Sequence, residues 1–178
     1  MSVGDWAESQ SIPARLGIPH PTGYPLFVLT GKLFSLLPVG SVAFRAGLLS
    51  AVAAAGCVAV AVLLATRLGV RPLIAAAAGL ALAFTGTLWL EATFPEMNSL
   101  HLLLVGLVLH RAIVWKAERR DRDLLIGALL CGLALSNHLL AATTVPIVIL
   151  FVLWQARRRL RERPILLPQG ALMVGLGL

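Results

Sequence analysis

The chain has 178 residues, of which 58% are hydrophobic and only 13% are charged, and its mean hydropathy is +0.89. Soluble domains carry about 25% charged residues, so this composition excludes a soluble globular protein and indicates an integral membrane protein. The net charge is +7, but the basic residues are concentrated in 111–122 and 157–163, without aromatic interleaving or zinc-ligand spacing. We therefore expect no nucleic-acid partner.

The first 40 residues are more polar than the rest and are rich in proline and glycine. Asp5 and Glu8 are spaced i, i+3, so they share a face if this segment is helical. Two close carboxylates can act as base, acid or cation ligands, but the same spacing also suits a solvated helix start with Asp5 as its cap. Residues 26–37 are apolar over only 12 positions, interrupted by Gly31 and Lys32, which predicts an interfacial helix rather than a span.

Apolar runs then predict the membrane spans. Residues 46–66 and 72–90 contain no charged residue. Residues 97–115 form a third candidate, in which Arg111 can reach the headgroups. Residues 124–154 are too long for one untilted span, and they are interrupted by the polar triplet at 136–138. Basic clusters flank this segment on both sides, so a hairpin of two short spans keeps both clusters on one side of the membrane.

The positive-inside rule orients the remaining loops. It places 67–71, 116–123 and 157–163 in the cytoplasm, and 1–40, 91–96 and the turn at 137 outside. The sequence thus predicts an all-α, polytopic transmembrane helical bundle of about five spans. Its parts are an exoplasmic loop with an interfacial helix (1–40), a transmembrane helical domain (41–157) and a cytoplasmic basic segment followed by the start of a further span (158–178). The polar residues collected at the outer face are Asp5, Glu8, His20, Glu91, Glu96, Asn137 and His138.

Each of these residues also has a structural interpretation. Thr93-x-x-Glu96 is a capping-box pattern with Pro95 in the first turn, and Glu91 can simply reach water at a span end. Asn137 and His138 can satisfy free backbone groups at a turn, or can hydrogen-bond a phosphate or a sugar.

The outer loop offers similar alternatives. His20 lies between two prolines and is either a rigidly presented imidazole or a loop residue without further function. Lys32 and Arg45 can pair with a lipid phosphate or anchor the interface. Tyr24 and Trp89 suit an aromatic belt, and the lone cysteines at 57 and 131 lie in apolar runs without metal-ligand spacing.

Three ordered motifs carry a family resemblance. Asp5-x-x-Glu8 followed by LGIPHPTGYPLFVLTGKLFSLLPVGSVAFRAGLLSA, then PEMNSLH, then GLALSNHLL, resemble the signatures of a bacterial family of protein O-mannosyltransferase-like membrane proteins. That family, formerly a domain of unknown function, is similar to the GT-C glycosyltransferases. The resemblance covers almost the whole chain.

The resemblance implies a bacterial plasma-membrane enzyme whose site faces outside and which takes a sugar, such as mannose, from a polyprenyl-phosphate donor for transfer to an unknown acceptor. By position, Asp5 matches the loop acid that serves as general base, and Glu8 matches the second acid. His20, Glu96, Asn137 and His138 match other polar signature positions, and we expect them to bind the substrate together with Tyr24, Lys32 and Arg45. A divalent metal held by Asp5, Glu8 and a histidine is compatible with this chemistry but is not required by it.

Two departures from the family pattern stand out. Family members begin with a transmembrane helix before the loop acid and continue through many further spans, whereas four residues precede Asp5 here; we expect a fragment or a misplaced start codon. Thr22 replaces a family proline. A non-catalytic protein that binds a lipid-linked sugar or acts as a scaffold subunit is the alternative function. Transport is disfavoured, because transporters place ionisable groups near the bilayer midplane.

Overall fold

The computed structural model describes residues 4–19 and 24–178, and for residues 4–7 the backbone alone. His20 and the side chain of Asp5 therefore lie outside the described residues. All regular structure in the described part is helical, which confirms the predicted all-α class. The helices are α1 (Gly4–Arg15), α2 (Pro25–Ser35), α3 (Val42–Arg67), α4 (Pro72–Ala83), α5 (Gly86–Thr93), α6 (Met97–Glu118), α7 (Asp121–Asn137), α8 (Ala141–Glu162) and α9 (Leu166–Gly177).

Among these helices, α3 and α6 are each long and apolar enough to cross a membrane. The bent pair of α4 and α5 makes a third span if it is counted as one. α7 has 17 residues and begins with three charged ones, and the last turns of α8 are rich in arginine. The predicted total of about five spans therefore stays a prediction.

The predicted continuous span at 72–90 is wrong in one respect, because the helix breaks between α4 and α5 with a bend of 64°. Thr85 adopts an extended conformation there, and its hydroxyl donates a hydrogen bond back to the carbonyl of Leu82 at 2.8 Å. Gly86 follows directly. A threonine that bonds its own preceding turn and a glycine with low helix propensity together explain the break.

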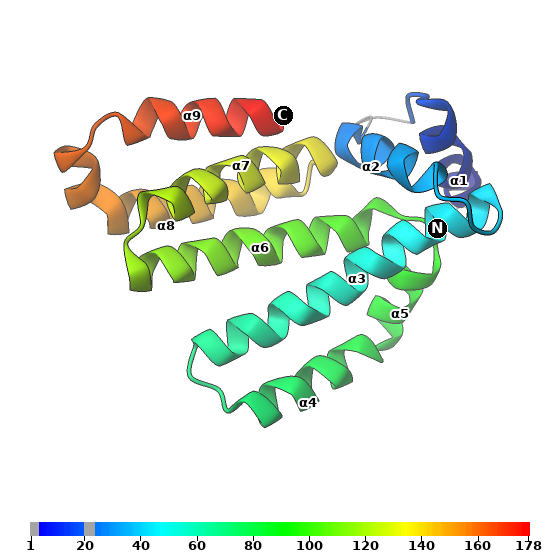
Figure 1. Cartoon of the computed structure of the whole chain (residues 1–178), viewed down its shortest axis with the longest axis horizontal. Helices are drawn as coiled ribbons and strands as arrows, with labels where there is room; N and C mark the ends of the chain where they lie inside the picture. Colours follow the sequence, from blue (N-terminus) through cyan, green and yellow to red (C-terminus); the bar gives the residue numbers. More distant parts are fainter. Residues whose placement is uncertain (1–3, 20–23) are drawn as a thin grey trace.

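The long helices run side by side along the molecule (Figure 1). α6 packs between α3 and α7, α4 lies along α3, and α9 lies along α7. The core between α3, α6, α7 and α8 is formed by small and aliphatic side chains such as Ala53, Leu104 and Ala134. α9 approaches α7 through Gly177, where an added Cβ would lie 2.6 Å from the carbonyl oxygen of Leu129. Such close backbone contact is typical of membrane helix pairs.

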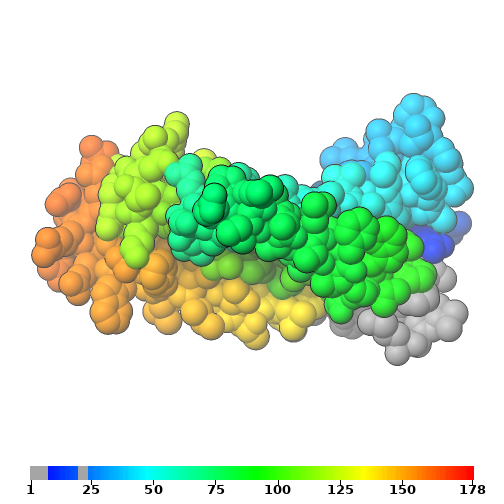
Figure 2. Space-filling view, turned by 90° about the horizontal axis from the view of Figure 1, so that it is seen from below, coloured from blue at the N-terminus to red at the C-terminus, as the bar shows by residue number. Residues whose placement is uncertain are grey.

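The two ends of the bundle differ in character (Figure 2). α2 and the start of α3 form a lobe at one end, and the ends of α6 and α8 lie at the other. At this second end, Glu118 pairs with Arg67 at 3.4 Å and with Arg120 at 2.7 Å. These pairs join two of the three predicted basic loops at one end of the bundle, which we call the basic end.

Asp121 closes the basic end. Its carboxylate accepts from Arg159 Nε at 2.8 Å and from Arg163 Nη1 at 2.8 Å. The hydrogen-bonded Arg159 guanidinium holds the pKa of Asp121 below its ordinary value. These pairs join the start of α7 to the end of α8, so the predicted hairpin over 124–154 is confirmed as two helices with their charged ends together. Which side of the membrane the basic end faces stays a prediction.

Candidate functional site

Three segments that are far apart in the sequence meet at the end opposite the basic end. The imidazole of His138, in the α7–α8 turn, lies 5.4 Å from the ring of Tyr24 and 5.4 Å from the ring of His101, measured between ring centroids. Tyr24 immediately precedes α2, and His101 lies in the second turn of α6. Both side chains are buried. We call these three residues the aromatic cluster.

Local structure explains how Tyr24 reaches this position. It adopts a left-handed conformation with φ of 42°, and Pro25 follows as the first residue of α2. The change of direction turns the Tyr24 ring into the bundle, where it packs with Phe27, Leu49 and Met97. The aromatic-belt prediction for Tyr24 is therefore wrong, because the ring is 8% exposed. Trp89 is exposed instead and stacks on Phe84 with ring centroids 5.7 Å apart.

His138 is held in one tautomer by the turn. Its Nδ1 accepts a hydrogen bond from the backbone N–H of Leu140 at 3.0 Å. A neutral imidazole has one donor and one acceptor nitrogen, so this bond assigns the proton to Nε2. Burial lowers the pKa of His138, which favours the neutral form. His138 can therefore offer an Nε2–H donor to a ligand.

Asn137 joins the α7–α8 turn to the start of α6. Its side chain is fully buried and donates from Nδ2 to the carbonyl of Met97 at 3.2 Å. Its Oδ1 has no hydrogen-bond partner among residues 4–19 and 24–178. The structure confirms that Asn137 lies at the predicted turn. Substrate binding through its Oδ1 stays a prediction.

The predicted capping box at 93–96 is wrong. Thr93 is the last residue of α5, and its hydroxyl donates to the carbonyl of Trp89 at 2.7 Å. Glu96 does not cap α6 with its side chain, and Pro95 precedes the helix. Ser50 of α3 replaces the box: its hydroxyl accepts from the Glu96 N–H at 3.0 Å and donates to the Glu96 carbonyl at 3.1 Å. A side chain from another helix thus fixes the start of α6.

The carboxylate of Glu91 is enclosed by the start of α6. Its Oε1 accepts from Asn98 Nδ2 at 3.3 Å, and its backbone carbonyl accepts from the Ser99 hydroxyl at 2.7 Å. Oε2 is buried without a hydrogen-bond partner in the described part of the chain. The expectation that this carboxylate simply reaches water is therefore wrong, because the first turn of α6 folds over it.

Lys32 and Arg45 hold helix ends. Lys32 Nζ donates to the carbonyl of Ala14 at 2.7 Å, at the end of α1. Arg45 Nη1 donates to the carbonyls of Ser35 at 2.6 Å and Leu37 at 2.9 Å, at the end of α2. Cations bound to the last carbonyls of a helix stabilise it. Both residues thus stabilise helix ends, and phosphate binding and anchoring at the membrane interface both stay predictions.

The predicted acids lie on α1, beside this end of the bundle. Residues 5 and 8 both lie within α1, so the condition of the prediction, that this segment is helical, is met. α1 packs on α2 and α3, and Pro13 lies so close to Gly31 that a Cβ added there would be 2.6 Å from the proline Cβ. The position of α1, and with it the acids, therefore depends on the absence of a side chain at Gly31.

His101 is the residue of this end that sequence reasoning did not select. Its Nδ1 is buried and has no hydrogen-bond partner among the described residues. Its signal in the sequence is its position at the end of the PEMNSLH motif, within the predicted span at 97–115. In the described part of the chain, no three histidine, cysteine or acidic side chains are grouped to hold a metal ion.

The fold therefore defines a polytopic α-helical membrane protein with a polar, aromatic-lined site at one end of its bundle. Residues 5–161 match the model of the Protein O-mannosyl-transferase TMEM260 N-terminal domain, and the chain belongs to this family. The chain is similar to Protein O-mannosyl-transferase TMEM260 of Mus musculus, at 33% identity over 171 residues that cover 92% of the chain and 24% of that protein. The chain thus spans about a quarter of the length of this relative. No solved structure matches it.

Proposed function

We propose that the chain contributes the site of a membrane glycosyltransferase that moves a sugar, mannose in the first instance, from a polyprenyl-phosphate donor to an acceptor hydroxyl at the exoplasmic face. One observation carries the proposal: the aromatic cluster brings together one residue from each of the three family motifs, at positions 24, 101 and 138. The relative is named as a protein O-mannosyl-transferase, which is consistent with a transferred mannose.

The chemistry requires a base for the acceptor and a donor for the departing phosphate. Asp5 takes the proton of the acceptor hydroxyl, with Glu8 as the second acid of the same helix. The bond between sugar C1 and the acceptor oxygen forms, and the bond between C1 and the phosphate oxygen breaks. The lipid phosphate leaves with the electron pair, and His138 donates a hydrogen bond to it from Nε2.

The neutral state of His138 suits this role. A neutral Nε2–H binds a phosphate oxygen without bringing a buried cation into the bundle. The rings of Tyr24 and His101 both pack against the imidazole. Asn137 holds the α7–α8 turn against the start of α6. We propose that the adjoining loop and helix ends surround the site with His20, Lys32, Arg45 and Glu96.

Sugar transfer tests the proposal. Membranes that contain the protein as its gene encodes it are supplied with polyprenyl-phosphate mannose, and release of the free lipid phosphate is measured. Asp5→Asn is expected to abolish release, whereas the matched acid-to-amide control Glu162→Gln, on an exposed residue of the basic end, keeps it. Undiminished release by the Asp5→Asn variant would show that Asp5 is not the base. Donor binding without release in the wild type would instead favour the non-catalytic alternative.

Cysteine labelling tests the exoplasmic orientation. Leu139 lies in the α7–α8 turn and Arg158 in the basic end, and both are exposed. In a background with Cys57→Ala and Cys131→Ala, an impermeant thiol reagent added outside should label Leu139→Cys and not Arg158→Cys. The opposite pattern would place the site at the cytoplasmic face.

A further inference from the structure

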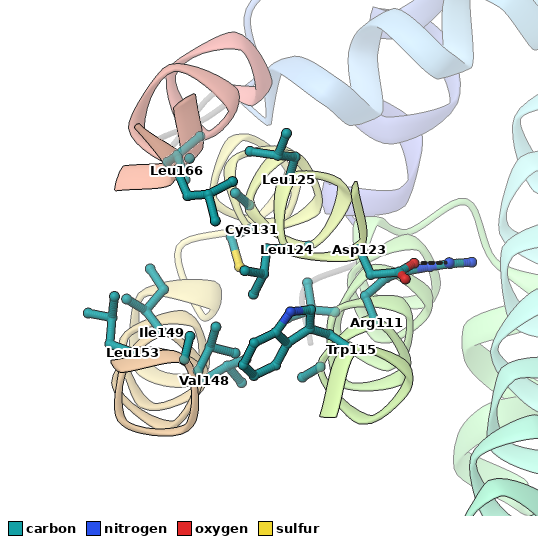
Figure 3. Close-up of a pocket in the computed structure, with 18 of the residues that line it drawn as sticks. Arg111, Trp115, Asp123, Leu124, Leu125, Cys131, Val148, Ile149, Leu153 and Leu166 are labelled. Carbon is teal, nitrogen blue, oxygen red and sulfur yellow. Dashed lines mark hydrogen bonds and ion pairs between the residues drawn. The ribbon is translucent and has the colours of Figure 1, made fainter. Parts of the chain in front are cut away.

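A cavity of about 260 Å³ lies between α6, α7, α8 and α9, near the basic end and away from the aromatic cluster. Figure 3 shows Val148, Ile149 and Leu153 on one wall and Leu166 on another. The lining is almost entirely apolar, with the ion pair of Arg111 and Asp123 at one side, where the atoms are 3.0 Å apart. An apolar cavity of about 150 Å³ already stays dry and binds benzene, so this one has room for a longer hydrocarbon.

Two buried polar atoms of the lining, Trp115 Nε1 and Asp123 Oδ2, have no hydrogen-bond partner in the described part of the chain, and only the indole nitrogen is a donor. Trp115 is 1% exposed, and its indole Nε1 has no hydrogen-bond partner within 4–19 and 24–178. Its ring projects from α6 into the space between α7 and α8 (Figure 3). A buried N–H without a partner is destabilising, which is why buried indole nitrogens usually find an acceptor. A ligand that brings an acceptor into the cavity would satisfy this group.

The position of Trp115 indicates which ligand this is. It lies in the last turn of the candidate span α6, and the guanidinium of Arg119, which follows the helix, lies 4.7 Å from the centre of its ring. The end of a membrane span, with the arginines that follow it, lies at the level of the lipid headgroups. The ester carbonyls of phospholipids occur at that level, with the acyl chains beneath them.

The cavity also opens toward the lipid. Leu153 of α8 and Leu167 of α9 line it, yet they are 40% and 50% exposed. Its wall is therefore continuous with the outer apolar surface of the bundle, which in a membrane is covered by acyl chains.

We propose that this cavity binds one acyl chain of a phospholipid, with the ester carbonyl accepting a hydrogen bond from Trp115 Nε1. The site is separate from the proposed transfer site and does not depend on it. It would bind a structural lipid near the basic end of the bundle.

Fluorescence quenching tests the proposal. The protein as its gene encodes it, with every tryptophan except Trp115 replaced by phenylalanine, is reconstituted with phosphatidylcholine brominated in its acyl chains. Bromine quenches indole fluorescence only at close range, so Trp115 should be strongly quenched despite its burial. Absence of quenching would show that the cavity is closed or filled by polypeptide, and would overturn the proposal.

Two glycines of α9 provide a matched pair of variants. A Cβ at either Gly170 or Gly175 meets nothing within 4 Å, but only Gly170 lines the cavity. Gly170→Leu should fill the cavity and remove most of the quenching, whereas Gly175→Leu should leave it unchanged. Equal quenching in both variants would mean that bromine reaches Trp115 by another route, which contradicts the assigned site.

The hydrogen bond is tested separately by native mass spectrometry of retained phospholipid. Trp115→Phe keeps an aromatic ring but removes the donor, so retention should weaken about fivefold, the effect of one ordinary neutral hydrogen bond. Unchanged retention by Trp115→Phe would overturn the role of Nε1.

Discussion

Ser50→Ala is the most direct test of how the start of α6 is positioned. Ser50 is 1% exposed, and its hydroxyl makes two hydrogen bonds across helices, both to the backbone of Glu96. Alanine fits the same space, so the substitution removes the hydroxyl without adding bulk. The variant therefore reports on these two bonds alone.

The expected loss of stability is about 2 kcal/mol, because each bond contributes about 1 kcal/mol net. A helix start that loses a serine cap shows a similar cost, about 0.5–2 kcal/mol. Glu96 is half-buried, so water can partly replace the hydroxyl, and a larger loss is not expected.

Reversible unfolding in detergent, followed by tryptophan fluorescence, measures the change. Ser35→Ala is the matched control, because the Ser35 hydroxyl donates only to the carbonyl of Lys32 within the same helix, at 2.7 Å. The control should lie within about 0.5 kcal/mol of the wild type. If Ser50→Ala is as stable as Ser35→Ala, then the serine does not fix α6 and the reasoning is refuted.

Three further predictions concern the site and its supports. Gly31→Ala should displace α1 and lower stability by about 1–3 kcal/mol, because the new Cβ would lie 2.6 Å from the Cβ of Pro13. Sugar transfer should fall together with stability. The control Gly175→Ala should keep both stability and transfer. Arg45→Ala should lower stability by about 2 kcal/mol through the lost carbonyl bonds while the KM for the lipid donor stays constant; a KM raised with stability unchanged would instead indicate phosphate binding. Burial lowers the pKa of His138, so stability should be complete above about pH 6.5 and should decline as the pH falls below that value, because the unfolded chain then binds the proton more tightly. Melting temperatures between pH 7.5 and 5.5 should show a smaller decline for His138→Gln, and an equal decline would contradict the assignment.

The sequence by itself determined the class of protein and the sorting of its loops. Low charge and uncharged runs of about 20 residues require helices in a membrane, because an apolar environment offers backbone groups no other partners. The basic clusters likewise predicted which loops lie together, and the pairs of Glu118 and Asp121 with arginines confirm that they meet at one end. The helix break near His138 was visible as a polar interruption.

Only the tertiary structure decided which side chains meet at the site. The spans are apolar on nearly every face, so periodicity does not indicate how each helix is rotated against its neighbours. The Ser50 bonds to Glu96 join residues 46 positions apart, and the Asn137 bond to Met97 joins residues 40 positions apart. For the same reason, the sequence placed His138 at a turn but missed His101, whose role depends on the rotation of α6 toward that turn.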